Sequence, residues 1–225
     1  MLSMDRYRLH WPDCRNVRDL GGLPTADGGT VRERALVRSD SPHRLTAEGL
    51  AALRAHGVRR VIDLRGTAEA AALPSVLSGE ELYRLMPFVD EVNDPARDLP
   101  DLAPIADVYK ASIIGNAPHI AAAVGAVADA PAGAVLVHCA AGQDRTGLLV
   151  AVLLRLAGVA DEVIAADYAY SAVCWERPGE CEPATIRAAL ARIDEAYDDV
   201  PDYLLAHGVT TAQLQAVRDR LRTAT

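Results

Sequence analysis

Two residues that could do chemistry together, Cys139 and Arg145, stand six positions apart in the segment HCAAGQDRTG at residues 138–147. A cysteine thiolate is a strong nucleophile, and an arginine guanidinium presents parallel N–H donors that match two oxygens of a phosphate. A nucleophile placed against a bound tetrahedral oxyanion can transfer a phosphoryl group through a cysteinyl-phosphate intermediate. The segment therefore favours phosphate-ester chemistry, although a lone Cys-x5-Arg also occurs by chance around a buried structural cysteine.

The elements around this segment would position both groups. The apolar run from Ala134 to Val137 predicts a buried strand, and the nearly continuous apolar run from Thr146 to Ala157 predicts a buried helix. The first N–H groups of a helix have no partner within it, and a loop that curls into the helix adds further N–H groups. Such an anion-binding nest also favours a thiolate over a thiol. We expect the substrate to be bound by Ala140, Ala141, Gly142, Gln143, Asp144 and Arg145.

Residues 138–147 resemble the signature loop of the cysteine-dependent protein tyrosine phosphatase superfamily. A second segment, NVRDLGG at residues 16–22 followed by Arg38 and Ser39, is similar to the N-terminal motif of the bacterial atypical tyrosine phosphatases. That group acts on phosphotyrosine, on phosphoserine or phosphothreonine, and on phosphoinositides. Its members usually have a lysine where this chain has Gln143, and that lysine is associated with phosphoinositide recognition. The substitution therefore counts against lipid activity.

Several residues around the phosphate loop are expected to support it: Asn16, Arg18, Asp19, Arg38, His138 and Thr146. The resemblance implies that the first three brace the loop from outside, and we expect Arg38 to pair with a nearby acid. Without the resemblance, polar residues before a double glycine also fit a turn held by side-chain hydrogen bonds. His138 would orient the loop rather than donate protons, and Thr146 could hydrogen-bond the thiolate.

Protonation of the leaving group requires an acid, and two aspartates are the main candidates. Asp144 lies inside the loop, and in the resembling group the loop aspartate is the favoured donor. Asp63 lies near the end of the apolar segment 58–64, which predicts a strand, and sites form at the carboxyl ends of strands in open α/β sheets. Asp63 fits a surface salt bridge with Arg65 equally well. Further aspartates lie in the polar segment 88–102, which predicts a loop: Asp90, Asp94, Asp98 and Asp101.

Helical and strand patterns alternate along the chain, so we predict an α/β fold in a single domain that spans residues 1–225. The resemblance implies a tyrosine-phosphatase-like arrangement, with a central, mostly parallel sheet flanked by helices and a helical C-terminal region that forms a short lid. The polar segment from Cys174 to Cys181 holds Trp175 and Arg177, which could line the mouth of the pocket. Ordinary helical packing with an exposed turn explains this segment equally well.

Composition limits the possible partners. The chain has 31 acidic and 23 basic side chains and a formal charge of −8, which argues against binding to nucleic acid or to an anionic membrane. No apolar run is long enough to span a bilayer, and the first residues lack the apolar core of a signal peptide. The four cysteines form neither a disulfide pattern nor zinc-binding pairs. We therefore expect a cytoplasmic protein without integral membrane association, metal or cofactor.

These observations predict a phosphomonoester hydrolase that forms a cysteinyl-phosphate, and the resemblance favours a protein tyrosine or dual-specificity phosphatase. Its partner would be a phosphorylated protein or a small-molecule phosphate ester. One alternative is a phosphatase of a sugar, nucleotide or inositol phosphate in a biosynthetic pathway, and another is a non-catalytic phosphate-binding module. The sequence leaves the oligomeric state open.

Overall fold

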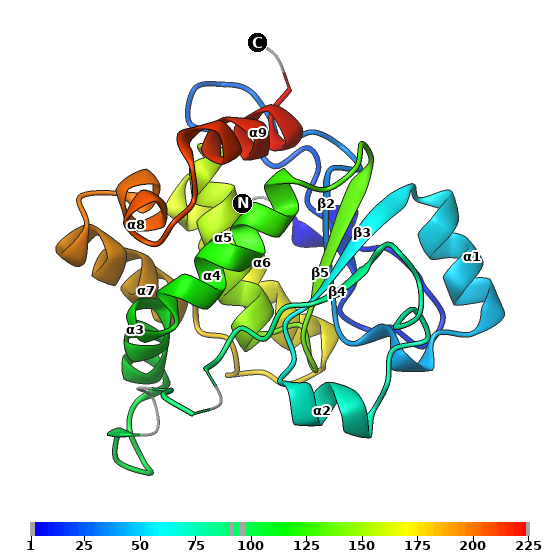
Figure 1. Cartoon of the computed structure of the whole chain (residues 1–225), viewed down its shortest axis with the longest axis horizontal. Coiled ribbons are helices and arrows are strands. Elements are labelled where there is room, and N and C mark those ends of the chain that lie inside the picture. Colours follow the sequence, from blue (N-terminus) through cyan, green and yellow to red (C-terminus); the bar gives the residue numbers. More distant parts are fainter. Residues whose placement is uncertain (1–2, 91, 95–97, 224–225) are drawn as a thin grey trace.

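The computed structural model describes residues 3–90, 92–94 and 98–223, and a five-stranded sheet lies at its centre (Figure 1). The strands follow the order β1-β2-β5-β3-β4, in which β1 is antiparallel to β2 and the other neighbours are parallel. Their bounds are β1 (Arg18–Asp19), β2 (Leu36–Ser39), β3 (Val58–Asp63), β4 (Tyr83–Leu85) and β5 (Ala134–His138). The prediction of an α/β fold with a mostly parallel sheet is confirmed.

Helices cover both faces of the sheet, with α1 on one face and α4 and α5 against the other (Figure 1). The α-helices are α1 (Ala47–Ala55), α2 (Thr67–Ala72), α3 (Ile105–Gly115), α4 (Ala117–Ala128), α5 (Asp144–Leu156), α6 (Asp161–Cys174), α7 (Pro183–Ala196), α8 (Val200–Ala206) and α9 (Thr211–Leu221). Two short 3₁₀ helices cover Met4–Tyr7 and Pro42–Arg44. Across the described part of the chain, only the bent pair of α3 and α4 combines the length and apolar content of a membrane span, and no single helix does.

The apolar side chains of β5 alternate between two cores. Val135 and Val137 belong to the larger core, which includes residues of α4 and α5, whereas Leu136 belongs to the smaller core beneath α1. Successive side chains of a strand point to opposite faces of a sheet. Because helices cover both faces, every residue of β5 is buried, and its sequence shows a continuous apolar run instead of an alternation with polar residues.

The register of the sheet places the carboxyl ends of three strands side by side. Ser39 of β2 and Asp63 of β3 both pair with His138 of β5. The segments that follow these strands therefore converge at one edge of the sheet, where open α/β sheets carry their functional sites. Helix α5 begins two residues earlier than the apolar pattern predicts, so Asp144 and Arg145 belong to its first turn.

The C-terminal region is helical, as predicted, but the connection between α6 and α7 is short. Residues 175–182, here called the rim segment, form turns and bends rather than a helix. This connection contains Trp175 and Arg177, for which the sequence leaves open a place at the mouth of the pocket or in an exposed turn. The C-terminal helices themselves pack on α3, α4 and α5 and extend the larger core.

A buried carboxylate joins β1 and β2 to α6. Asp167 Oδ1 accepts a hydrogen bond from Arg18 Nε at 2.8 Å, and Asp167 Oδ2 accepts one from Arg38 Nη1 at 2.5 Å. Arg18 Nη2 also donates to the Asp167 carbonyl oxygen at 3.1 Å. The three charged side chains are at most 1 % exposed. Burial by itself raises the pKa of Asp167, but Arg38 and Arg18 reverse the shift and hold that pKa below its ordinary value.

Replacement of Asp167 by asparagine should lower the free energy of unfolding by about 3–5 kcal/mol, because two buried arginines lose their counter-charge. A lowered folded-state pKa stabilises the protein fully above the unfolded pKa of about 4, and this contribution is lost as the pH falls through the folded pKa. Urea unfolding can be measured at neutral pH and at about pH 3. The difference in the free energy of unfolding between the wild-type protein and Asp167→Asn should be smaller at the lower pH. Asp194→Asn removes only an exposed pair with Arg155 and serves as the control. Equal destabilisation by both variants would contradict the prediction.

Candidate active site

Residues 139–143 connect β5 to α5 in a tight turn whose shape depends on Gly142. The φ angle of Gly142 is +67°, and a Cβ added there would lie 2.4 Å from the carbonyl oxygen of Ser39. Only glycine combines this conformation with such a close approach. The loop therefore lies directly against the end of β2. Cys139 stands at its start, with 2 % of its surface exposed.

Side chains from three other segments hold the loop carbonyl groups. Asn16 Nδ2 donates to the carbonyl oxygens of Ala141 and Gly142, both at 3.0 Å. Arg38 Nη2 donates to the Gly142 carbonyl oxygen at 2.6 Å. Trp175 Nε1 donates to the Ala141 carbonyl oxygen at 2.9 Å. The carbonyl groups of Ala141 and Gly142 thus point toward residues outside the loop.

The N–H groups of the loop are arranged in the opposite way. Within the described ranges, the backbone N–H groups of residues 140–145 donate to no backbone carbonyl. They lead into the positive end of α5, and free N–H groups at such a place can bind an anion. Thr146 Oγ1 is buried nearby and has no hydrogen-bond partner among the described residues, so the expected bond to Cys139 does not form here.

Arg145, in the first turn of α5, is held by Glu69 of α2. Arg145 Nη1 donates to Glu69 Oε2 at 2.7 Å, and Arg145 Nη2 donates to Glu69 Oε1 at 3.2 Å. A guanidinium has five N–H donors, so this fork leaves three of them for another ligand. Burial opposes the charge, but Glu69 and the nearby Cys139 raise the pKa of Arg145 above its ordinary value. Sequence reasoning missed Glu69, since nothing in the spacing connects it to a residue 76 positions away.

Asp144 is exposed at the rim of the loop, and a buried tyrosine contacts it from below. Tyr109 Oη donates to Asp144 Oδ1 at 2.5 Å and lies 2.8 Å from Tyr168 Oη. Burial and the neighbouring Asp144 raise the pKa of Tyr109, which therefore remains a neutral hydrogen-bond donor. The second tyrosine comes from α6, so hydrogen bonds through Tyr109 connect α6 to Asp144.

Asp63 has a different environment. Its carboxylate is completely buried and accepts hydrogen bonds from Arg65 Nη2 at 2.6 Å and from Tyr83 Oη at 2.7 Å. Burial alone raises the pKa of Asp63, but the hydrogen bonds from Arg65 reverse the effect and lower it. His138 Nε2 lies 3.7 Å away, and burial lowers the pKa of His138. His138 Nδ1 lies 3.1 Å from the carbonyl oxygen of Cys139, beside the start of the loop.

The described contacts of Asp19 lie away from the signature loop. Its carboxylate accepts hydrogen bonds from the N–H groups of Gly21 and Arg34 and lies 3.1 Å from His56 Nε2. The reason is the strand geometry of β1. Arg18 and Asp19 are neighbours on a strand, so their side chains point to opposite faces of the sheet, and only Arg18 faces α6.

The rim segment touches the signature loop at Gln143. Gln143 Nε2 donates to Glu180 Oε2 at 3.2 Å and to Cys181 Sγ at 3.4 Å. Together with the bond from Trp175 to the loop, these contacts fix the rim segment beside the signature loop. The side chain of Gln143 is mostly buried and supplies no positive charge.

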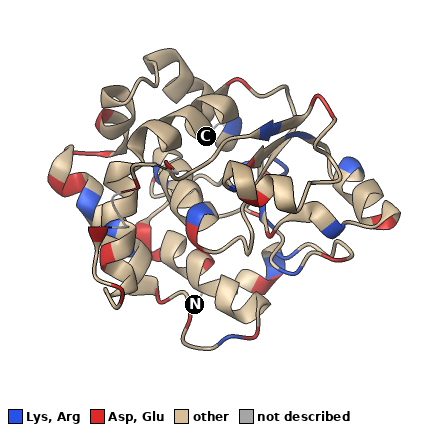
Figure 2. Cartoon of the chain, turned by 60° about the horizontal axis from the view of Figure 1, so that its bottom comes forward, with Lys and Arg blue, Asp and Glu red and all other residues tan. Residues whose placement is uncertain are grey.

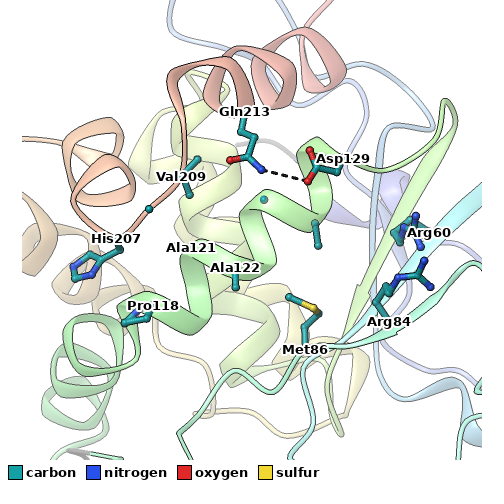
Figure 3. Close-up of a pocket in the computed structure, with 13 residues that line it drawn as sticks. Arg60, Arg84, Met86, Pro118, Ala121, Ala122, Asp129, His207, Val209 and Gln213 are labelled. Carbon is teal, nitrogen blue, oxygen red and sulfur yellow. Dashed lines mark hydrogen bonds between the residues drawn. The ribbon is translucent and has the colours of Figure 1, made fainter.

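A pocket of about 610 Å³ lies away from the signature loop, between α4, α9 and the two strands β3 and β4 (Figure 3). Arg60 and Arg84 lie together at one side of it, and Ala121 and Ala122 form part of its apolar wall. None of the predicted catalytic residues lines it. The size of a hollow therefore does not single out residues 138–147 in this structure.

Comparison with known proteins agrees with this geometry. Residues 9–223 match the tyrosine phosphatase family. The chain is 31 % identical over 179 residues to a provisionally named tyrosine-protein phosphatase of Cupriavidus necator, and this alignment covers 72 % of this chain and 62 % of that relative. It is 29 % identical over 230 aligned positions to a tyrosine-protein phosphatase of Nostoc commune, which covers 88 % and 78 %. It is 31 % identical over 188 residues to the triple specificity protein phosphatase PtpB of Mycobacterium tuberculosis, which covers 70 % and 66 %.

The chain thus spans slightly less than two thirds of the length of the first and third of these relatives. The match to the family nevertheless extends over nearly all of its residues, from before the NVRDLGG motif to the end of α9. It includes the strand, loop and helix that carry Cys139 and Arg145. The expectation drawn from the two motifs is confirmed, and the chain belongs to the tyrosine phosphatase family.

Proposed function

We propose that the chain hydrolyses phosphomonoesters through a cysteinyl-phosphate intermediate, as a protein tyrosine or dual-specificity phosphatase. The observation that carries this proposal is the group of free N–H donors at residues 140–145, beside Cys139 and an Arg145 fixed by Glu69. Membership of the family supports phosphorylated substrates. The names of the relatives favour a phosphoprotein over a small phosphorylated metabolite as the substrate.

The substrate phosphate would bind over Cys139 with its oxygens directed at the free N–H groups and at the unused donors of Arg145. Negative charge on these oxygens would be balanced by the N-terminal end of α5 and by the guanidinium. Phosphoryl transfer needs little besides positioning and electrostatic stabilisation, and both are provided by groups already in place. No metal or cofactor enters this scheme.

In the first step, Cys139 Sγ attacks the phosphorus as a thiolate, and the bond from phosphorus to the ester oxygen breaks. Asp144 gives its proton to the departing oxygen, so the alcohol or phenol leaves as a neutral molecule. In the second step, a water oxygen attacks the phosphorus and the S–P bond breaks. Asp144 takes the proton from that water, which restores the thiolate and releases inorganic phosphate.

Asp144 is a better proton donor than Asp63. A general acid must reach the leaving group, and Asp144 is exposed at the rim of the loop. Asp63 is buried under its hydrogen bonds with Arg65 and Tyr83, and the lowered pKa keeps it ionised. We assign Asp63 a structural role, as an anchor for the strand end next to His138.

The remaining predicted residues would act as positioning groups. Asn16 and Arg38 hold the carbonyl groups of the loop, and Arg18 acts on the loop through Asp167.

Gln143, tied to the rim segment, offers no cation to an inositol phosphate, which favours phosphopeptides over phosphoinositides. A free thiolate requires a reducing compartment, so we place the protein in the cytoplasm. The charge of −8 leads us to propose that nucleic acid is not a partner.

Replacement of Cys139 by serine should reduce turnover of p-nitrophenyl phosphate by about 10³-fold or more while binding of tungstate persists, because the N–H groups and Arg145 are unchanged. Arg145→Ala should weaken both turnover and tungstate binding. Steady-state assays and calorimetry measure the two effects. Cys14→Ser is the matched control, since Cys14 lies outside the loop. Unreduced turnover in Cys139→Ser would refute the proposed mechanism.

Replacement of Asp144 by asparagine should lower kcat/KM by about 10²–10⁴-fold for substrates with a poor leaving group, such as phenyl phosphate. The loss should be smaller for p-nitrophenyl phosphate, whose leaving group needs less help from an acid. Asp63→Asn should reduce stability without this dependence on the leaving group. If the leaving-group effect appears in Asp63→Asn instead, the assignment of the two carboxylates is reversed.

Replacement of Glu69 by glutamine should lower kcat/KM by about 10–100-fold, because Arg145 loses its charged partner and its fixed orientation. Tungstate binding should weaken in parallel, whereas the urea unfolding midpoint should change little. Glu48→Gln removes an exposed carboxylate from α1 and provides the control. An unchanged tungstate affinity in Glu69→Gln would show that Glu69 does not position Arg145.

A further inference from the structure

The pocket of about 610 Å³ in Figure 3 takes no part in the proposed reaction, and it is called the distal pocket here. Its volume lies within the range of about 300–1,000 Å³ that is usual for sites of small organic ligands. None of residues 138–147 lines it, so a ligand there does not compete for space with a phosphate at the signature loop. The lining residues used below are Arg60, Arg84, Met86, Ala121, Ala122, Asp129, His207, Val209 and Gln213.

Two charged side chains of this pocket extend a face of the sheet that is otherwise apolar. Arg60 and Ile62 lie two positions apart on β3, so their side chains point to the same face. Ile62 belongs to the larger core, which includes residues of α4. Arg84 of β4 pairs with Ile62 in the register of the sheet and therefore shares that face. Positive charge thus occupies positions where a strand covered by helices normally carries apolar residues.

The two guanidinium groups are adjacent. Arg60 Nη1 and Arg84 Nη1 both donate to the carbonyl oxygen of Glu81, at 3.2 Å and 2.6 Å. Arg84 Nη1 also donates to the carbonyl oxygen of Tyr83 at 2.7 Å. Among the described residues, the two side chains donate only to such backbone carbonyl oxygens, which carry no net charge. A guanidinium has five N–H donors, so most of the donors on both side chains are left for a ligand.

The arginine pair lacks a counter-charge of its own strength. Burial and the neighbouring Arg84 lower the pKa of Arg60, and the opposing effect of Glu81 does not reverse the shift. In the view of Figure 2, basic and acidic residues are interspersed over the surface, and the chain carries a formal charge of −8. Two adjacent cations repel each other, and an anion that binds both removes this repulsion.

The wall beside the arginines is apolar. Met86 lies next to them in Figure 3, and Ala121, Ala122 and Val209 continue the apolar surface toward the connection between α8 and α9. Covering such a surface contributes about 25 cal/mol for each Å² removed from water. A purely inorganic anion would leave this wall uncovered, so the ligand that fits best has an apolar body.

The other polar groups of the pocket already have partners. Asp129 Oδ2 accepts a hydrogen bond from Gln213 Nε2 at 3.3 Å (Figure 3). His207 Nε2 lies 2.9 Å from Tyr197 Oη, and burial lowers the pKa of His207, which is therefore neutral at neutral pH. Positive charge in the pocket is thus confined to the arginine pair.

We propose that the distal pocket binds a small organic anion with an apolar body, of the class of medium-chain carboxylates. The carboxylate oxygens accept hydrogen bonds from Arg60 and Arg84, and the hydrocarbon chain lies along Met86 and the alanines of α4. A neutral lipid would leave the arginine pair without a counter-charge. This site goes beyond the proposed function, because neither the nucleophile nor Arg145 takes part in it.

Calorimetry at low salt tests the proposal with octanoate, acetate and octanamide, each titrated into the protein with and without saturating tungstate. Octanoate should bind about tenfold or more tightly than acetate, which lacks the apolar body, and than octanamide, which lacks the charge. Tungstate should leave the affinity for octanoate unchanged. Arg60→Gln/Arg84→Gln should weaken octanoate binding by about tenfold or more. Arg187→Gln/Arg192→Gln removes two partly exposed charges from α7 and should keep the wild-type affinity.

A second variant tests the apolar wall without touching the arginines. Ala122→Glu introduces a carboxylate at an exposed position of α4 that lines the pocket, and it should abolish octanoate binding by repulsion. Glutamate is a good helix former, so the fold should persist. Ala51→Glu, at an exposed position of α1, is the matched control. Urea unfolding midpoints show whether each variant is folded.

The proposal is overturned if octanoate does not bind, if it binds no better than acetate or octanamide, or if Arg60→Gln/Arg84→Gln keeps the wild-type affinity. Octanoate binding that tungstate abolishes would place the ligand at the signature loop and would also overturn it. An equal loss of affinity in Arg187→Gln/Arg192→Gln would show that net charge, and not the distal pocket, determines binding. The proposed function is tested separately by turnover of p-nitrophenyl phosphate, so either proposal can fail while the other stands.

Discussion

The carbonyl groups of Ala141 and Gly142 are tied to side chains outside the loop, and the rest of the site follows from that constraint. A trans peptide is planar, so its N–H points away from its own carbonyl group. When Asn16, Arg38 and Trp175 hold the carbonyl groups on one side, the following N–H groups must face the other side. The loop thereby presents N–H groups that donate to no backbone carbonyl among the described residues.

The residues that hold this arrangement include buried charged side chains. Arg18, Arg38 and Asp167 are removed from water, which is costly unless every charge is hydrogen-bonded. Here two cations share one carboxylate, so the group keeps a net positive charge beneath the loop. That excess charge lies in a medium of low dielectric constant, where it would act on a phosphate bound at the proposed site with little screening. The same residues therefore determine the shape of the loop and contribute to its field.

The strand, loop and helix around Cys139 could be predicted because they are local in sequence: an apolar run, small residues and a second apolar run. Contacts between distant segments could not. Glu69 and Asp167 are ordinary acids on helices until the fold brings them to Arg145 and Arg38. The sequence also could not show that the contacts of Asp19 lie away from the loop, because a motif does not say to which face of a two-residue strand each side chain points. The sheet order likewise depends on non-local pairing.

The fork between Glu69 and Arg145 has a kinetic consequence. Arginine has a long side chain, and fixing its rotamers costs up to about 2 kcal/mol of conformational entropy. In this protein that cost is met when the chain folds, since the guanidinium is already oriented by the carboxylate. An arriving dianion needs no search by the side chain, and its capture should be limited by diffusion and local desolvation instead of by rearrangement of the enzyme.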